Sequence, residues 1–409
     1  MKTNNISNFK GSLIFLFALF VIICFYPYEF YSIYLLFLPK RAFETCLILF
    51  IPLVLIYIIT QQNGKLKITH LYSLAFCQWF GSTLVNINRG NFNAIISQSV
   101  LFLFVIILIH IIHQTIGLES FYKKYNRWIF VMAALGTLTW VLATFFHYSP
   151  LYALPDRAEI GRLIYNYGFT FAVLDETSSL RYSGFFDEPG AMAYWGIYAL
   201  VINRLFVKEK WIEIPLIVCL LFTFSAGFYI QIILYIILFS LSKKHFVSGM
   251  LMCGLFAICI FIIESTKGSD LGFIYDMTIG RLDTMFGNTQ DIYLDNRSES
   301  TELAYKEFLS NPIFGTKKLN LNIGNNIFEP LALNGLVGTF FILFPFFWLL
   351  VSSIKNKDYD TTKAMIVLFA GFAHRPFHDN LLYYFILYSI IVLYVSRLHN
   401  FRLGIQCQE

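Results

Sequence analysis

The stretch AIISQSVLFLFVIILIHII, residues 94–112, decides the fold class of this chain. It contains no charged residue, and a helix rising about 1.5 Å per residue makes it long enough for the roughly 30 Å of hydrocarbon in a bilayer. Its apolar residues form a continuous run instead of alternating with polar ones, which favours a helix over a barrel strand. The sequence therefore predicts a helix that spans a membrane.

The whole chain has a composition that fits this stretch. Apolar residues make up 57% of it, against roughly 45–50% in soluble domains, and charged residues only 13%, against about 25%. A soluble core of this size would need a charged surface that the chain cannot supply. We expect an all-α polytopic membrane protein with about twelve transmembrane helices, at residues 11–27, 42–60, 71–86, 94–112, 128–146, 190–206, 212–226, 228–242, 246–263, 326–351, 362–376 and 381–396.

The distribution of Lys and Arg predicts the orientation of these helices, because inner loops carry an excess of both. If both termini are cytoplasmic, every inner connection holds at least two basic residues, such as those around Lys65, Lys123, Lys208, Lys243 and Lys355. The net charge of +5 reflects this bias and indicates no nucleic-acid partner. The seven cysteines show no metal-ligand spacing, so we expect neither a metal site nor a disulfide framework.

Two long connections fall on the outer face, at residues 147–190 and 264–325, within a single integral membrane domain that covers residues 1–409. Long loops without a role are uncommon, so function is expected there. In the second loop, residues 299–309 read as a short amphipathic helix, with Leu303 and Phe308 as apolar contacts and with Glu302 four residues before Lys306. The pair Asn311-Pro312 is expected to end it.

Motifs in these loops resemble those of a known family. The first is Arg181-Tyr-Ser-Gly-Phe-Phe-Asp-Glu-Pro-Gly190, which leads into an apolar span. The second comprises Arg297, the short helix, Asn311-Pro-Ile-Phe-Gly315, Asn326 and Gly335-Leu-Val-Gly338. Together with the length, span number and two outer loops, they make the chain similar to the Wzy-type O-antigen polymerases and the related O-antigen ligases, over its whole length.

The resemblance implies a GT-C-like membrane glycosyltransferase in the bacterial inner membrane. Such an enzyme passes a growing glycan from undecaprenyl diphosphate to a hydroxyl of another lipid-linked repeat unit, at the periplasmic face. The expected partners are the undecaprenyl-diphosphate-linked oligosaccharide, membrane lipid and a regulator of polysaccharide chain length. The resemblance implies no cofactor.

Arginines suit this reaction, because guanidinium groups stay charged and bind phosphate oxygens bidentately as the pyrophosphate leaves. Arg181 and Arg297 are the first catalytic candidates because they lie within the motifs, and Arg281 is the third. Arg157 and Arg375 are candidates for substrate binding, and Arg162 is a weaker one. A solvated loop charge or a lipid-headgroup anchor is the alternative for each.

A base for the acceptor proton is a separate question. Glu188 is one candidate, with pairing to an arginine as the alternative, and His374-Arg-Pro-Phe-His378 supplies two imidazoles at the outer end of a predicted span. Family ligases typically carry a histidine where this chain has Asn325, which can position a hydroxyl but cannot accept its proton. Asn325 and Asn326 are therefore candidates for substrate binding, and a route without a dedicated base is favoured.

Two other functions remain open. An O-antigen ligase would use lipid A–core as the acceptor, but Asn325 and the sizeable first loop weigh against it. A lipid-linked oligosaccharide flippase, which is a transporter, would also have about twelve spans. Transporters place polar residues at mid-membrane in broken, repeated helices, whereas the polar clusters here lie at the predicted outer ends.

Overall fold

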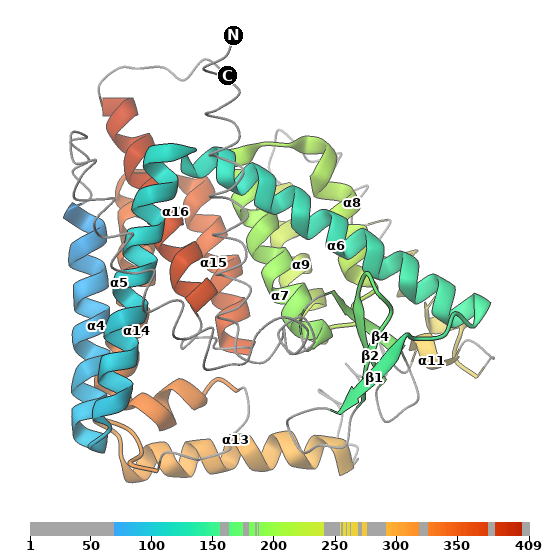
Figure 1. The fold of residues 1–409 in the computed structure, drawn as a ribbon, viewed down its shortest axis with the longest axis horizontal. Helices are drawn as coiled ribbons and strands as arrows, with labels where there is room; N and C mark the ends of the chain where they lie inside the picture. Colours follow the sequence, from blue (N-terminus) through green and yellow to red (C-terminus); the bar gives the residue numbers. More distant parts are fainter. Residues whose placement is uncertain are drawn as a thin grey trace. The chain divides into compact units, whose positions relative to one another are not determined.

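The computed structural model shows a mostly helical protein that also contains a small sheet (Figure 1). The chain divides into two compact units. The first comprises residues 1–123, 302–352 and 376–409, and the second residues 124–301 and 353–375. The structure describes residues 69–155, 163–174, 180–184, 186, 188–240, 254, 257–258, 260–261, 263–268, 272–275, 292–318, 326–374 and 381–402.

The first unit is built on α4 (Thr69–Arg89), α5 (Phe92–Thr115), α14 (Glu329–Lys355) and α16 (Leu381–Arg402). The helix α5 packs against both α4 and α16. Polar side chains join these apolar helices: Gln78 donates to the carbonyl of Ile342 at 3.3 Å and accepts a bond from the hydroxyl of Tyr388. Hydrogen bonds of this kind hold helices together where burial of apolar surface cannot.

The second unit contains most of α6 (Leu118–Phe146), then α7 (Pro189–Ile202), the π-helical turn η1 (Asn203–Val207), α8 (Lys210–Leu221), α9 (Ala226–Ser240), the short α11 (Gly272–Tyr275) and α15 (Tyr359–His374). The helix α7 is buried along its whole length, against α8, α9, α15 and the sheet. The helix α13 (Ile292–Ser310) begins in the second unit and ends in the first.

Within residues 147–190, the first of the two long connections, four short strands form an antiparallel sheet in sequence order. They are β1 (Tyr152–Pro155), β2 (Leu163–Asn166), β3 (Phe171–Leu174) and β4 (Leu180–Gly184). The register pairs Ala172 with Tyr182 and Val173 with Arg181, with an irregularity next to Phe171. The sequence analysis did not predict this sheet, so the all-α fold class requires this addition.

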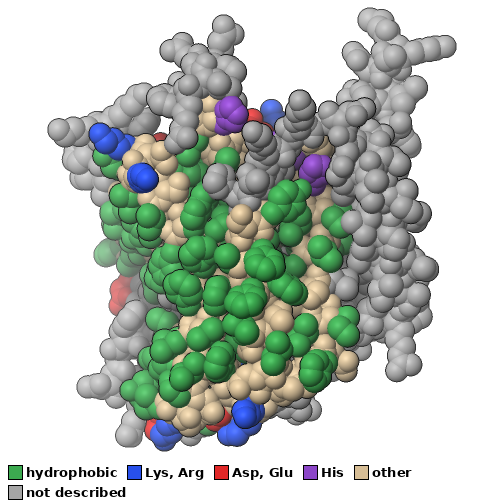
Figure 2. All heavy atoms as spheres, turned by 90° about the vertical axis from the view of Figure 1, so that its left-hand side faces the viewer, with side chains coloured by type: hydrophobic (Ala, Val, Ile, Leu, Met, Phe, Trp, Pro, Cys, Tyr) green, Lys and Arg blue, Asp and Glu red, His purple; other side chains and the backbone are tan. Residues whose placement is uncertain are grey.

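Among the residues that the structure describes, four helices are long and apolar enough to cross a membrane, at Leu118–Phe146, Pro189–Val207, Glu329–Lys355 and Leu382–His399. The helix α14 is apolar on its exposed side as well as on its buried side. Its exposed side chains include Leu336, Phe340, Phe347, Val351 and Ile354. Figure 2 shows the molecule from the side of α4, where hydrophobic side chains cover the middle of the view and Lys and Arg lie toward its upper and lower edges. These apolar helices indicate a membrane-embedded protein.

Nine of the twelve predicted spans coincide with helices, namely those beginning at residues 71, 94, 128, 190, 212, 228, 326, 362 and 381. The spans 11–27 and 42–60, and most of 246–263, lie outside the described residues. The predicted break between the two short spans falls slightly earlier than expected: α8 ends at Leu221 and α9 begins at Ala226. The total of about twelve spans and the single membrane domain stay predictions.

Candidate functional site

Arg181 is bound to the backbone where α8 gives way to α9. Its Nε donates to the carbonyl of Thr223 at 3.2 Å, and its Nη2 donates to the carbonyl of Phe224 at 2.9 Å. Thr223 and Phe224 lie in the turn between Leu221 and Ala226, outside both helices, and Phe224 has a left-handed φ of 49°. The guanidinium therefore has a structural role, because it binds the backbone carbonyls of the turn between α8 and α9. Any contact with a ligand would be additional to this role.

Tyr182, the next residue of β4, is fully buried and points into a notch left by a glycine. A Cβ at Gly136 of α6 would overlap the ring of Tyr182, so glycine is required there. The Tyr182 hydroxyl donates to the carbonyl of Cys219 at 2.5 Å, and the indole of Trp140 donates to the carbonyl of Leu180 at 2.8 Å. These bonds fasten β4 to α6 and α8.

The rest of the first motif forms the beginning of α7. Gly184 has a φ of 65°, and a Cβ there would lie 2.9 Å from the sulfur of Met192. Glu188 is the half-buried N-cap residue of α7 and makes no capping bond through its side chain, while Pro189 occupies the first turn. Proline suits that position because its missing N–H would have no partner there. The motif thus connects the sheet to a completely buried helix.

In the second motif, two segments far apart in the sequence pair backbone to backbone. Leu336 N–H donates to the carbonyl of Pro312 at 2.8 Å, and Val337 N–H donates to the carbonyl of Ile313 at 3.0 Å. Helical geometry is interrupted at Gly335, with φ 62° and ψ −171°. The carbonyls of residues 312 and 313 therefore satisfy the first N–H groups of the helical segment that follows the break.

The glycines of this motif permit the close approach of the two backbones. A Cβ at Gly315, whose φ is 75°, would overlap the backbone of Leu333, and one at Gly335 would overlap the backbone of Ile313. A Cβ at Gly338 would lie 2.6 Å from the Cγ2 of Val85 on α4. The structure thus brings together Asn311–Gly315 and Gly335–Gly338, which the sequence analysis assigned to one motif.

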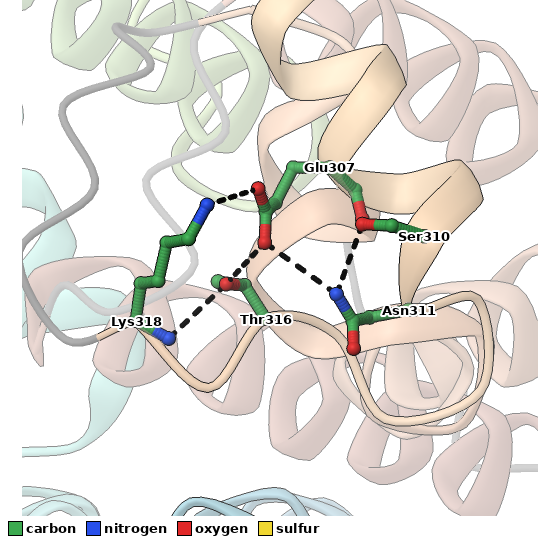
Figure 3. Close-up of polar contacts among 5 residues, drawn as sticks. All are labelled: Glu307, Ser310, Asn311, Thr316 and Lys318. Atoms are coloured by element: carbon green, nitrogen blue, oxygen red, sulfur yellow. Dashed lines mark hydrogen bonds and ion pairs between the residues drawn. The ribbon is translucent and has the colours of Figure 1, made fainter.

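The C-terminal end of α13 carries a polar cluster that sequence reasoning missed (Figure 3). Glu307 is 8% exposed and accepts bonds from Thr316 Oγ1 at 2.7 Å and Lys318 Nζ at 2.9 Å. Asn311 Nδ2 lies 3.4 Å from the same carboxylate and donates to Ser310 Oγ at 3.0 Å. The bonds from Lys318 and Thr316 lower the pKa of Glu307 below its ordinary value.

Arg89 extends this cluster within the first unit. It is the last residue of α4, and its Nε donates to the carbonyl of Thr316 at 3.0 Å. Thr316 N–H in turn donates to the carbonyl of Ala332 on α14, at 2.8 Å. The end of α4, the segment after α13 and the start of α14 therefore meet at Thr316. The only sequence signal was Arg89-Gly90 at the end of a span, which is too common to single out.

The short helix of the second loop is longer than predicted and is turned differently. It spans Ile292–Ser310 instead of residues 299–309, and it ends before Asn311 as expected. The pair Glu302–Lys306 is present at 2.5 Å. The prediction for Leu303 is wrong, because that side chain is 42% exposed and the fully buried Ala304 takes its place beside Phe308.

The other predicted site residues are placed only in part. Arg297 lies within α13, and His374 is the last residue of α15. Asn326 Oδ1 accepts a bond from Phe328 N–H at 2.9 Å, which positions the turn before α14. Arg157, Arg162, Arg281, Asn325, Arg375 and His378 lie outside the described residues. Among the residues that are described, no three His, Cys, Asp or Glu side chains form a group that could hold a metal ion.

Comparisons with known proteins leave the family open. No family model matches the chain, and no curated protein matches it.

Proposed function

We propose that the chain polymerises undecaprenyl-diphosphate-linked oligosaccharide repeat units into O-antigen or a similar surface polysaccharide. The proposed architecture has about twelve transmembrane helices in a GT-C-like arrangement, with both termini cytoplasmic and the two large loops periplasmic. The reaction is a glycosyl transfer that needs no metal, and it takes place at the outer face of the bacterial inner membrane.

One observation carries the proposal: the two halves of the second motif pair backbone to backbone. The bonds from Leu336 and Val337 to the carbonyls of Pro312 and Ile313 join segments that are distant in the sequence. The glycines at positions 315 and 335 leave the room that this pairing needs. If these short, degenerate motifs matched the family only by chance, there would be no reason for their segments to pair in one structural unit. Their pairing supports the resemblance on which the function rests.

The proposed chemistry is a displacement at the anomeric carbon of the donor. A hydroxyl oxygen of the acceptor repeat unit forms the new glycosidic bond, the bond from the anomeric carbon to the pyrophosphate oxygen breaks, and undecaprenyl diphosphate leaves with the electron pair. Arg181, Arg297 and Arg281 are the residues proposed to stabilise the charge that grows on this leaving group. Arg157, Arg375, Asn325 and Asn326 would position the substrates.

The acceptor proton has two possible routes. Glu188, His374 or His378 could accept it, or it could leave late without a dedicated base. The described part of the chain places Glu188 at the N-cap of α7, without a capping bond from its side chain. We favour the second route because the position of the ligase histidine is occupied here by Asn325.

Contacts within the second unit support the proposed orientation. Arg127 pairs with Glu209, and Arg204 pairs with Glu213 at 3.4 Å; all four residues lie on or beside predicted inner connections. At the opposite ends of these helices, Arg181 of the first outer loop binds carbonyls of the α8–α9 junction, which is also predicted to be outside. Segments assigned to one side of the membrane thus contact one another.

Deletion of the gene, followed by a gel of surface polysaccharide, tests the proposed function. A lipid A–core that carries a single repeat unit is the expected result. A bare core with polymer retained on lipid would instead indicate a ligase, and repeat units trapped inside the cell would indicate a flippase. A wild-type ladder in the deletion strain would exclude all three roles. Restoration of the ladder by the wild-type gene is the control.

A further inference from the structure

The C-terminal end of α6 and the adjoining sheet expose an apolar surface. It consists of Phe145, Phe146, Tyr148, Leu151, Tyr152 and Phe169, here called the loop patch. Three of these side chains are largely uncovered, with exposed fractions of 72% for Phe146, 65% for Leu151 and 66% for Phe169. Contiguous exposed apolar surfaces on proteins mark sites of interaction.

The central residues of the loop patch lie next to one another. The rings of Tyr148 and Tyr167 have centroids 5.8 Å apart, so the chain leaving α6 packs on the turn between β2 and β3. Leu151 N–H donates to the carbonyl of Asn166 at 2.7 Å, and a Cβ built at Gly168 would lie 3.5 Å from Leu151 Cδ1. Leu151 therefore lies against the turn that carries Phe169.

The loop patch continues the exposed apolar side of α6. Val131, Leu138 and Phe145 are 50%, 53% and 49% exposed and follow one another at intervals of seven residues, which places them on one face of the helix. Trp140 packs toward the interior: the centroid of its ring lies 5.2 Å from the ring centroid of Phe222 and 5.3 Å from that of Phe224. Because α6 is a candidate membrane span, the face that would meet lipid passes directly into the loop patch.

The loop patch also contains no charge. The described segments 145–155 and 163–174 include neither Lys, Arg, Asp nor Glu. The side-chain Nδ2 of Asn166 donates a hydrogen bond to the hydroxyl of Tyr152 at 2.7 Å. Leu151 and Phe169 offer no group that could bind the hydroxyls of a sugar. Aromatic side chains beside aliphatic ones, without charge, are typical of the lipid headgroup boundary.

We propose that the loop patch is a membrane-docking surface, which rests in the lipid interface at the C-terminal end of α6. The occupant is the bilayer itself, and a soluble glycan or a second protein is the alternative that the test must exclude. Docking would hold the sheet, and with it the motif that begins at Arg181, beside the lipid headgroups. This inference does not depend on the proposed glycosyl transfer.

Depth-dependent fluorescence quenching tests the proposal. Leu151→Cys and Phe169→Cys, each in a full-length cysteine-free background, are labelled with an environment-sensitive fluorophore. The labelled protein is placed in nanodiscs of phosphatidylethanolamine and phosphatidylglycerol, with or without a phosphatidylcholine that carries a nitroxide near its headgroup. Iodide serves as the aqueous quencher. Val131→Cys, on the exposed face of α6 and close to the end of the predicted span 128–146, is the lipid control. Asp360→Cys, whose native side chain is 70% exposed, is the water control.

The expected result is that the lipid-borne nitroxide removes most of the fluorescence at both loop positions, while iodide removes little. Iodide quenching equal to that of the Asp360→Cys control would overturn the proposal, because the surface would then face water. Protection from both quenchers would also overturn it, because protein would then cover the surface. A misfolded variant is identified by loss of the wild-type elution profile, and the other loop position then decides the outcome.

Discussion

The carbonyl of Ile313 accepts a hydrogen bond from the backbone N–H of Val337, at 3.0 Å. This bond ties the segment after α13 to the helical segment after the break in α14. The first N–H groups of a helix otherwise need a side chain or water as a partner, and here the chain's own carbonyls take that role. The two segments therefore depend on each other for their conformation.

Gly335→Ala should disrupt this pairing. The new Cβ would overlap the backbone of Ile313, and a residue other than glycine at a φ of 62° and a ψ of −171° costs a further ~1–3 kcal/mol. Gly117→Ala is the matched control, because Gly117 also has a positive φ, of 81°, but has nothing within 4 Å of a new Cβ. Thermal unfolding in detergent should show a much larger fall in Tm for Gly335→Ala. Equal falls would mean that backbone strain alone, and not the pairing, requires the glycine.

Arg181→Ala should abolish polymer while the protein still reaches the membrane, and Arg181→Lys should retain part of the activity, because lysine keeps the charge but loses the two-point fork. Losing a hydrogen bond from a charged donor also costs about 1.5–3 kcal/mol of stability. Arg297→Ala should likewise abolish polymer.

Tyr182→Phe is the control for Arg181, because it removes the bond to the Cys219 carbonyl without changing charge. It should lower Tm and leave a normal polysaccharide ladder on the gel. If Tyr182→Phe abolished polymer as completely as Arg181→Ala, the role of Arg181 would be to fasten β4. Long polymer from both arginine-to-alanine variants would contradict a role in binding pyrophosphate.

Glu307 should make the protein less stable in acid. Because its pKa lies below the ordinary 4.5, the folded state binds this proton less readily than the unfolded chain does. Its stabilisation is complete above pH 4.5 and is lost as the pH falls through the lowered pKa. The Tm of the wild type should exceed that of Glu307→Gln at neutral pH, and the difference should shrink on acidification.

The control for Glu307→Gln is Glu302→Gln, a substitution of the same kind on the same helix. Glu302→Gln breaks an exposed pair with Lys306, in which the two side chains are 62% and 67% exposed. Exposed pairs contribute little to stability, so Glu302→Gln should hardly change Tm at any pH. A difference between the wild type and Glu307→Gln that persisted unchanged in acid would show that charge plays no part.

The orientation can be tested with single cysteines in a cysteine-free background. Cysteines at Thr177 and Asn322 should react with an impermeant thiol reagent in intact spheroplasts, and cysteines at Asn63 and Asn356 only after lysis. The measurement is the fraction of protein labelled before and after lysis. Labelling of Asn322→Cys only after lysis would place the second loop inside and remove the proposed site from the outer face.

Sequence reasoning succeeded where one short-range pattern determines the structure. Uninterrupted apolar runs located helices such as α5 and α16, because the length and the apolar character of a run are enough to predict a membrane helix. Asn311-Pro312 marked the end of α13, because the residue before a proline avoids helical conformation. The Glu302–Lys306 pair followed from helical spacing alone.

Features that depend on tertiary contacts were missed. The strands β2 and β3 are only four residues long, and the hairpin signal around Gly168 was overlooked in a chain dominated by helices. Leu303 and Ala304 are adjacent, and only the packing of α13 against Ala332 decides which is buried. The partners of Arg181 lie more than 40 residues further along the chain, so no local pattern could indicate them.

The most direct test of the central claim is reconstitution of the purified protein in liposomes with an undecaprenyl-diphosphate-linked repeat unit as the only substrate. The products are separated by size, and released undecaprenyl diphosphate is measured alongside. The account predicts a ladder of two, three and more repeat units, with one undecaprenyl diphosphate released per bond formed, and no ladder from Arg297→Ala. Folded wild-type protein that leaves the repeat unit unchanged would contradict it.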